Sequence, residues 1–496
     1  MPNRASFASH LAPKITVFAA AVVLWGSCAG DSASVVGAGG AIDPSTAQDG
    51  ARGGAAATNG AGGARSIPIM SNGVGGTSGA TGTGGGPTSS QGGGAGGTPS
   101  ADATATQTPT PTSNQISITV AAGMRTRVAT PVTFSLMGKT SAGIGQLRPS
   151  DGGASLPLQI DESGKATFVL PMLAAGAQAS FTIDTAASPS DAVVKAKKGD
   201  DAVEVTLGGA PVMRYQMQGK LPAGIGDAYL RGGYLHPIQT PMGATITDDY
   251  PGDHRHHHGL WSAWAKSSFE GHDVDFWNMG GRTAKVDFAD LDRTWDGPVH
   301  GGFRSRQAHV VLSGGAKTAL NETWDVTVYR THAEVPPPYY LFDLDSVQEA
   351  ASMSPVMLHQ YIYGGFALRG AAGWGGAGGA TFVTSEGKNR ANGDGTNARW
   401  CYIGGKVASK DGAGMGGYAA LMHPSNFRAP QPVRINPTDP FFSIAPVRDS
   451  GFDIAAGKPY LTRFRLVVLD GAPDAALLER LWNDYADPPA VTVNGP

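Results

Sequence analysis

The sequence predicts a mainly β protein: a large antiparallel β-sandwich followed by one C-terminal helix. Apolar and polar side chains alternate from Ile116 to Val120, as in a strand with one buried face. Similar runs recur along the chain between breaks rich in Gly, Pro and Asp, a pattern that favours two packed antiparallel sheets. The other predicted strands are 132–136, 156–160, 166–170, 180–183, 203–207, 212–217, 308–312, 323–329, 340–344 and 461–469.

The predicted helix follows the last of these strands. Pro473 and Asp474 are typical of a helix start. Asp487, Pro488 and Pro489 end the helix, because proline cannot continue it. We expect residues 488–496 to form a loose tail. Five side chains fall on one face at helical spacing, which indicates packing onto the sandwich: Leu477, Leu478, Leu481, Trp482 and Tyr485.

Residues 1–28 are typical of an export signal. Arg4 and Lys14 precede an apolar run, 15–25, that is too short to span a bilayer. Leu24-Trp25-Gly26-Ser27-Cys28 resembles a bacterial lipobox, although Trp25 stands where leucine is usual. We therefore predict lipidation at Cys28, or plain secretion as the alternative. The expected location is the cell envelope, at the bacterial outer membrane or in the periplasm, with the N-terminal lipid anchor as the only membrane contact.

Residues 29–115 are predicted to be a linker. Eighteen of the fifty residues from 51 to 100 are glycine, and such a segment buries too little apolar surface to offset its ordering entropy. The folded domain is expected to span 116–487.

Charge and cysteine content exclude several classes of protein. The net charge is -3 and no basic stripe is present, so nucleic acid is not an expected partner. With only two cysteines, Cys28 and Cys401, the chain has neither a disulfide framework nor a cysteine-based zinc site. We expect Cys401 to be a small buried apolar residue.

The segment from Asp253 to Trp261 is the richest in groups that exchange protons near neutral pH. Four histidines occupy five positions, 254–258. If this segment were extended, the side chains of His254, His256 and His258 would share one face and His257 would point the other way. No cofactor is predicted, but a divalent metal is possible, with His254 and His256 as its ligands, and polar loop histidines without chemistry are a further alternative.

Other residues complete the predicted site. Asp253 and Asp275 are candidates for orienting a histidine ring, and His423 could contribute from another strand. Aromatic faces beside hydrogen-bonding groups suit a hydroxyl-rich ligand such as a sugar. The residues expected to bind substrate are Trp261, Trp277, Asn278, Asp248 and Asn426.

Six motifs resemble those of the bacterial PmoA-like exported proteins, often labelled "methane oxygenase PmoA", over residues 116–487. They are Arg231-Gly232-Gly233-Tyr234-Leu235-His236-Pro237, Asp248-Asp249, Asp253-His254-Arg255-His256-His257, Asp275-Phe276-Trp277, Ser385-Glu386-Gly387 and His423-Pro424-Ser425-Asn426. The resemblance implies a sandwich similar to mutarotase-like proteins by analogy. In that family arginine is common at position 258, which favours His254, His256 and His257 as the essential histidines.

These observations predict an enzyme that acts on a carbohydrate or glycoside by histidine and aspartate acid–base chemistry, as a hydrolase, lyase or epimerase. Membrane methane oxidation is not expected, since no apolar run of about 20 residues follows the signal. Two alternatives stay open. One is a noncatalytic glycan-binding surface module, and the other is a metal-dependent oxidoreductase, as the family label suggests.

Overall fold

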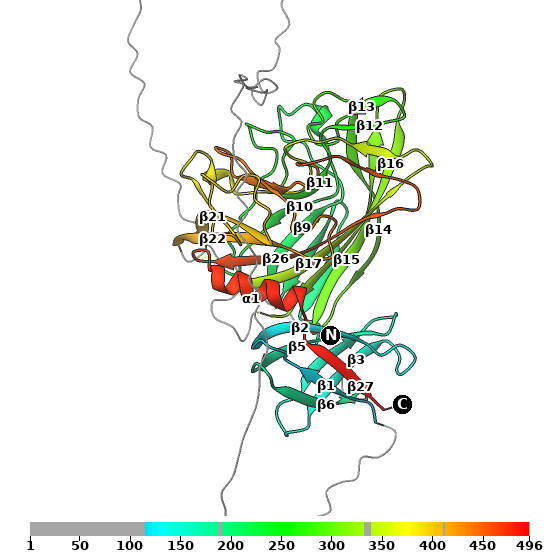
Figure 1. The fold of residues 1–496 in the computed structure, drawn as a ribbon, viewed down its shortest axis with the longest axis vertical. Helices are drawn as coiled ribbons and strands as arrows, with labels where there is room; N and C mark the ends of the chain where they lie inside the picture. The colour runs from blue at the N-terminus through cyan, green and yellow to red at the C-terminus, as the bar shows by residue number, and fades with distance from the viewer. Residues whose placement is uncertain (1–114, 187–190, 332–338, 410–411, 496) are drawn as a thin grey trace, which may run out of the picture. The chain divides into compact units, whose positions relative to one another are not determined.

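The computed structural model describes residues 115–186, 191–331, 339–409 and 412–495. These residues are mainly β, with antiparallel sheets and one α-helix near the C-terminal end (Figure 1). The predicted fold class is therefore confirmed. The predicted signal, the lipidation site Cys28 and the linker lie outside the described residues, so export and anchoring stay predictions.

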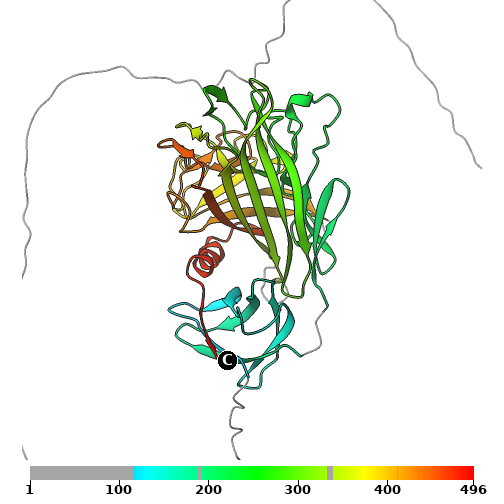
Figure 2. The ribbon, with the colours of Figure 1, turned by 90° about the vertical axis from the view of Figure 1, so that its right-hand side faces the viewer.

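The longest strands belong to an eight-stranded antiparallel sheet, and those within residues 284–350 lie side by side in green to olive in Figure 2. Inward-facing apolar side chains alternate with polar ones along them, as the sequence pattern predicts. In spatial order the strands are β14 (Ala284–Trp295), β15 (His300–Val311), β16 (Lys317–Tyr329), β17 (Tyr339–Ala350), β26 (Tyr460–Asp470), β22 (Gly412–Met422), β21 (Trp400–Ser409) and β20 (Ala380–Thr384).

A second eight-stranded antiparallel sheet carries the segments that position the candidate site. Its central strands are buried on both faces, so they read as apolar runs rather than alternating ones. In spatial order the strands are β23 (Val433–Ile435), β24 (Phe441–Ile444), β19 (Gly365–Arg369), β11 (Leu260–Ala263), β10 (Tyr234–Ile238), β9 (Ala210–Gln216), β8 (Ala202–Leu207) and β7 (Val194–Lys198).

The main hydrophobic core lies between these two sheets and draws side chains from both. Phe366 of β19 stacks on Phe464 of β26 with ring centroids 4.2 Å apart. Tyr215 of β9 lies 6.2 Å from the ring of Trp324 of β16. Each buried aromatic of this size contributes about 1.5–3 kcal/mol through removal of apolar surface from water. The pairing of the two sheets is thus a sandwich held by apolar burial.

Two smaller sheets complete the described strands. The four-stranded one comprises β13 (His272–Val274), β12 (Ser267–Phe269), β18 (Val356–Leu358) and β25 (Phe452–Ile454). The seven-stranded one has its own core around Phe168 and comprises β2 (Arg127–Ser135), β5 (Lys165–Leu173), β4 (Leu156–Ile160), β3 (Gly143–Pro149), β6 (Gln178–Asp184), β1 (Ser117–Ala121) and β27 (Ala490–Asn494). The described residues also include two short 3-10 helices, at Asp227–Tyr229 and Ala372–Trp374.

The strand β27 corrects the predicted loose tail. Ala490 to Asn494 pairs in antiparallel register with β1 along its whole length. The alternating residues Val491 and Val493 pack on the core of that sheet, and this burial holds the segment in place. A run of only five residues after two prolines gave too short a pattern to identify a strand.

The helix α1 (Ala475–Ala486) begins where the sequence predicts. The side chain of Asp474 accepts a hydrogen bond from the backbone of Leu477, which satisfies one of the free N–H groups at the helix start. Leu478 and Leu481 pack against the outer face of the sheet at β22 and β26 (Figure 1). The predicted packing face is confirmed.

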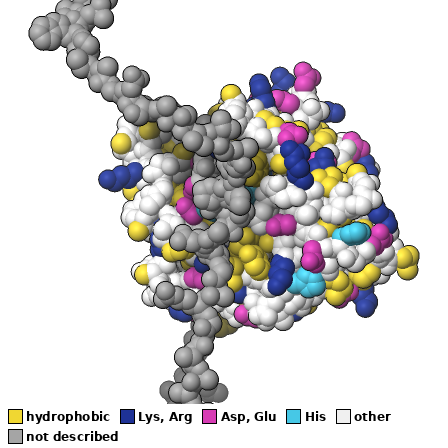
Figure 3. All heavy atoms as spheres, turned by 90° about the horizontal axis from the view of Figure 1, so that it is seen from above, with side chains coloured by type: hydrophobic (Ala, Val, Ile, Leu, Met, Phe, Trp, Pro, Cys, Tyr) yellow, Lys and Arg dark blue, Asp and Glu magenta, His cyan; other side chains and the backbone are white. Residues whose placement is uncertain are grey.

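Acidic and basic side chains are interspersed over the face drawn in Figure 3. No single-sign stripe gathers on that face, in keeping with the charge pattern of the sequence.

Candidate active site

The histidine run forms a tight turn between β10 and β11. The backbone N–H of His257 donates to the carbonyl of His254 at 2.8 Å, and that of Tyr250 donates to the carbonyl of His257 at 3.1 Å. Gly259 then lets the chain enter β11, because a Cβ there would lie 2.3 Å from the carbonyl oxygen of Leu235. The assumption of an extended strand is therefore wrong for this segment.

The turn changes which histidines share a face. His254 stacks on His257 with ring centroids 4.6 Å apart, and His256 meets His257 edge to face at 4.7 Å. His254 and His256 are partly exposed, whereas His257 is buried. The rings of His254, His256 and His257 therefore lie together, although an extended strand would point His257 away from the other two. His258 lies apart from them.

His258 belongs to a separate buried group. Its Nδ1 lies 2.7 Å from a carboxylate oxygen of Asp249, whose other oxygen accepts from the hydroxyl of Tyr234 at 2.9 Å. The ring also packs against Tyr250. The side chain is 0% exposed, and burial lowers its pKa although Asp249 acts to raise it. His258 therefore supports the fold and has no surface on which to meet a substrate.

Arg369, at the end of β19, binds the carboxylate of Asp253 beside the histidines. One guanidinium nitrogen donates to both carboxylate oxygens of Asp253, each at 2.9 Å. Another lies 3.3 Å from Nδ1 of His257. Since guanidinium only donates, this Nδ1 accepts, and the proton of neutral His257 sits on Nε2. Burial lowers the pKa of His257 well below its usual value, which keeps the ring neutral.

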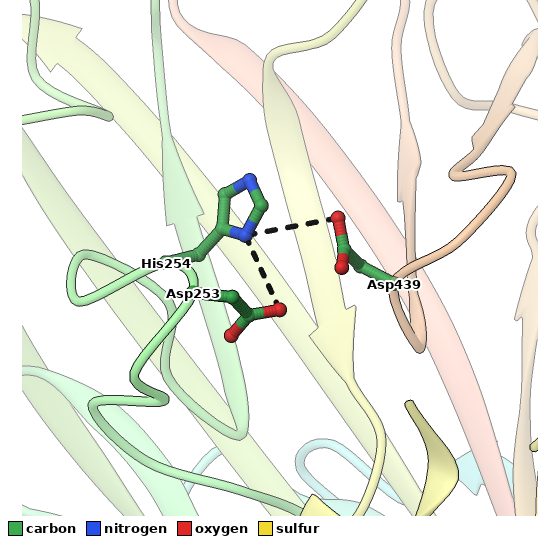
Figure 4. A group of neighbouring side chains, drawn as sticks. All are labelled: Asp253, His254 and Asp439. Atoms are coloured by element: carbon green, nitrogen blue, oxygen red, sulfur yellow. Dashed lines mark ion pairs between the residues drawn. The ribbon is translucent and has the colours of Figure 1, made fainter. Parts of the chain in front are cut away.

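Asp439 approaches the same point from the loop between β23 and β24. The side-chain oxygen of Asn436 accepts from the backbone of Thr438 and Asp439, so the loop is held as a turn. Nδ1 of His254 lies 3.4 Å from an oxygen of Asp253 and 3.7 Å from an oxygen of Asp439 (Figure 4). Two carboxylates from separate loops therefore flank one imidazole.

The pKa values of Asp253 and Asp439 are shifted in opposite directions. Burial raises the pKa of Asp439, and the neighbouring Asp253 carboxylate raises it further. Burial also acts to raise the pKa of Asp253, but the adjacent imidazole of His254 and the hydrogen bonds from Arg369 hold it well below its ordinary value. Asp253 is therefore a fixed anion, and Asp439 is the more easily protonated partner. Burial, reinforced by the neighbouring histidines, lowers the pKa of His256 to about 3.

The imidazole of His254 and the two carboxylates beside it also have the composition of a metal site. Ligand atoms of Asp253, His254 and Asp439 all lie within 4.8 Å of one another. Nδ1 of His254 is buried and has no hydrogen-bond partner, because both carboxylates are too far away for one. His254 was a predicted metal ligand. His256, the other, is next to it, with ring centroids 5.6 Å apart.

Asp248 lies close enough to the cluster to interact with the charge of Arg369. Burial raises the pKa of Asp248, while the backbone N–H of Asp249 and the guanidinium of Arg369 act to lower it. Of the residues expected to bind substrate, Asp248 is the one that the structure places near the histidines with some exposure.

Asp275 lies in a different place from its predicted position beside a histidine. One of its oxygens accepts from the backbone of Trp277 and Asn278, and the other accepts from the side chain of Asn278 at 2.6 Å. The carboxylate closes a turn, and within the described residues it bonds to no histidine. Burial raises its pKa, and the three hydrogen bonds act in the opposite direction.

Trp261 and Trp277 are buried core residues and do not form an exposed platform for stacking on a sugar. Trp261 is 0% exposed and Trp277 is 1% exposed. Trp261 packs 5.0 Å from the ring of His257 and 5.1 Å from that of Trp277. They support the histidine rings from behind, and a sugar has no access to their faces.

His423 and Asn426 lie outside the cluster. The ring of His423 bonds to the hydroxyl of Ser425 at 2.7 Å and packs on Tyr485 of α1. Asn426 exchanges hydrogen bonds with the backbone of Arg463. The motif that contains both residues forms a turn that packs against α1. Within the described residues, His423 and Asn426 make no hydrogen bond or ring contact with the histidines at 254–258.

Two residues of the cluster, Arg369 and Asp439, were not predicted. Arg369 ends an otherwise apolar strand, and an arginine in such a run is a signal of a buried charge pair. Asp439 sits in Asn436-Pro437-Thr438-Asp439-Pro440, where the asparagine and prolines indicate a turn but not its position. Neither residue has a sequence neighbour that points to the histidines.

The fold and this cluster define an antiparallel β-sandwich protein with a His–Asp–Arg site on loops of one sheet. The chain belongs to a family of unknown function, DUF6807, whose pattern matches residues 202–483. That match covers both eight-stranded sheets except the short strand β7. No protein of curated function matches the chain.

The family match corrects the expected membership in the PmoA-like proteins, which is not found. Short motifs read one by one do not separate families as a match over 282 positions does. The metal-dependent oxidoreductase alternative loses the support of that family label, and it stays a prediction. Among the described residues, no helix is both long enough and apolar enough to cross a membrane.

Proposed function

We propose that the chain is an enzyme that performs acid–base chemistry on a carbohydrate or glycoside, with Asp253, His254 and Asp439 as its reactive groups. The observation that carries this proposal is the imidazole of His254 lying between two carboxylates, 3.4 Å and 3.7 Å away. All three side chains are partly exposed. They can therefore meet a ligand, unlike His257 and His258.

Hydrolysis, elimination and epimerisation of a sugar each need one group that gives a proton and one that takes it. Neighbouring carboxyl groups with pKa values pushed apart supply such a pair. In this proposal Asp439 carries a proton, and His254 exchanges it. Asp253, held as an anion by Arg369, orients the imidazole.

His256 has a different part in this proposal. Its pKa of about 3 makes it neutral at physiological pH, so it offers one hydrogen-bond donor and one acceptor without a charge. Such a ring suits the hydroxyl groups of a sugar. Asp248, which is partly exposed, offers further acceptor oxygens.

The test uses wild-type protein and the variants His254→Gln and Asp439→Asn against aryl glycosides and neutral oligosaccharides, with released sugar and unsaturated product measured. Each variant should lose about 10²–10⁴-fold in turnover, the usual contribution of a general acid or base. Their unfolding curves should match the wild type. Wild-type protein that binds oligosaccharides but turns none over would instead indicate a glycan-binding module.

A divalent metal centre at the same residues is the second candidate function. Ligand atoms around an ion at about 2.1 Å lie roughly 3.0–3.5 Å apart, close to the separations of His254 from Asp253 and Asp439. One imidazole and two carboxylates suit first-row divalent ions such as Zn²⁺ or Mn²⁺. The chemistry supplied would be activation of water or polarisation of a sugar oxygen.

Chelation separates the two candidates. Acid–base chemistry without a metal predicts full turnover after treatment with EDTA and dialysis. A metal centre predicts loss of turnover, its recovery with Zn²⁺ or Mn²⁺, and about one ion per chain in elemental analysis of wild-type protein but not of His254→Gln.

A further inference from the structure

A cavity of about 690 Å³ with several polar groups in its lining lies at the four-stranded sheet. It is formed by β12, β13, the turn at Asp275 and the segment after β18. Pockets that bind small organic ligands have volumes of about 300–1,000 Å³. The residues that matter for its chemistry are Lys266, Ser267, Asp273, Asn278, His359 and Tyr361.

Ser267 marks this cavity as incomplete without a ligand. The residue lines the cavity, is 2% exposed, and its hydroxyl has no hydrogen-bond partner. Buried hydroxyl groups in folded proteins are nearly always paired, because an unpaired one costs about 1–3 kcal/mol. A ligand hydroxyl is one partner that restores the missing bond.

Tyr361 provides the aromatic surface that the buried tryptophans do not. It lines the cavity and is partly exposed. Its ring meets Tyr363 edge to face at 4.7 Å, and Tyr363 packs 5.1 Å from Trp277. This backing fixes the tyrosine, and a fixed aromatic ring beside polar groups is typical of sugar recognition.

The remaining lining groups are hydrogen-bonding and of mixed charge. Exposed Lys266 and Asp273 carry opposite charges. Asn278 offers an amide held in place by Asp275 and by the hydroxyl of Tyr363. Nε2 of His359 is engaged by Ser268 at 2.9 Å, which fixes that ring as well. The lining also contains the Asp275 carboxylate, which is already engaged by Trp277 and Asn278. The several neutral hydrogen-bonding groups favour an uncharged ligand rich in hydroxyls.

The cavity is linked to the histidines through Trp277. The ring of Trp277 packs against Tyr363 on one side and lies 6.1 Å from the ring of His257 on another. Asn278, which lines the cavity, is the next residue. The cavity and the histidine cluster therefore lie on two sides of one buried aromatic ring.

We infer that this cavity is a recognition site for a neutral oligosaccharide, with Tyr361 stacking on a sugar ring and Ser267, Asn278 and His359 bonding its hydroxyls. The choice of a saccharide rests on the proposed function, but binding in the cavity does not require turnover. The two can therefore fail separately.

The experiment is isothermal titration of the full chain with cellotetraose, xylotetraose, maltotetraose and chitotetraose. At least one should bind the wild type. Tyr361→Ala should weaken that binding about tenfold or more, whereas Tyr361→Phe should keep it, since stacking needs the ring alone. Ser267→Ala should weaken binding several-fold without loss of stability, because its hydroxyl has no partner in the protein. Phe427→Ala, an exposed aromatic away from the cavity, is the matched control.

Failure of all four saccharides to bind the wild type, or unchanged affinity in Tyr361→Ala, overturns the inference. His254→Gln separates it from the proposed function. Loss of turnover in that variant together with unchanged affinity in Tyr361→Ala refutes the cavity alone. Weak binding in Tyr361→Ala together with full turnover in His254→Gln refutes the proposed chemistry alone.

Discussion

A single guanidinium nitrogen of Arg369 bonds both carboxylate oxygens of Asp253, at 2.9 Å each, across 116 residues of sequence. The arginine is 3% exposed, and another of its nitrogens lies 3.3 Å from His257. One buried cation thus fixes the charge of the carboxylate and the tautomer of the neighbouring imidazole.

Arg369→Lys should destabilise the protein by about 1–3 kcal/mol, because a lysine cannot reproduce these bonds and leaves the buried Nδ1 of His257 unpaired. Urea unfolding measures the change. Arg306→Lys is the matched control, since Arg306 pairs with Asp290 and Asp292 on the surface and should change stability by less than about 0.5 kcal/mol. Equal effects of the two substitutions would refute the organising role of Arg369.

Replacing His258 should destabilise the protein more than replacing His256, although the two lie only two positions apart. His258→Ala removes a fully buried ring and the partner of Asp249, so we expect a loss of about 2–4 kcal/mol in unfolding free energy. His256→Ala removes a partly exposed ring that makes no hydrogen bond within the described residues, so its cost should stay within about 1 kcal/mol. Thermal or urea unfolding compares them, and the reverse order would contradict the turn geometry.

Acid should destabilise the protein through Glu322. This buried carboxylate accepts from His309 at 2.8 Å and from Trp324 and Ser346 at 2.7 Å each. Burial acts to raise its pKa, but these bonds and the charge of His309 lower it below the ordinary 4.5. A lowered pKa means that the stability is present above pH 4.5 and is lost as the pH falls through the folded-state pKa.

Glu322→Gln should therefore be less stable than wild type at pH 7 and should lose less stability than wild type between pH 5 and acid pH. Urea unfolding across that range measures both slopes. Parallel pH profiles for the two proteins would show that Glu322 does not contribute this dependence.

Cys401 should be chemically silent in the folded protein. The thiol is 0% exposed and burial raises its pKa, whereas reaction requires the exposed thiolate. With Cys28→Ser as background, a thiol reagent at neutral pH should label the native chain only as fast as it unfolds, and should label it fully in urea. Rapid stoichiometric labelling without denaturant would contradict the burial.

Much of the fold could be predicted from local pattern alone. The alternating run at 156–160 matches β4, and the apolar stripe from Leu477 to Tyr485 matches α1, because each pattern directly reports one buried face. The short final strand was missed. Its five residues acquire their position from pairing with β1, at the other end of the described chain.

The candidate site could be predicted only in part. The density of titratable groups located the segment 253–257, but the backbone bonds that close its turn cannot be read from side-chain type. Arg369 and Asp439 reach it through strand order in the sheet, which brings β19 and β24 side by side. Trp261 and Trp277 were expected to bind substrate, because aromatic residues serve both cores and ligand sites, and burial alone distinguishes the two.

In the proposed reaction, Asp439 and His254 carry the proton during turnover of a sugar substrate. The most direct measurement is the rate of product release by Asp439→Asn relative to wild type, on any glycoside of the panel that wild type turns over. We expect the rate of product release to fall about 10²-fold or more, while the urea unfolding curve stays unchanged. A rate within about threefold of wild type would contradict it, because an effect that small is below what a general acid contributes.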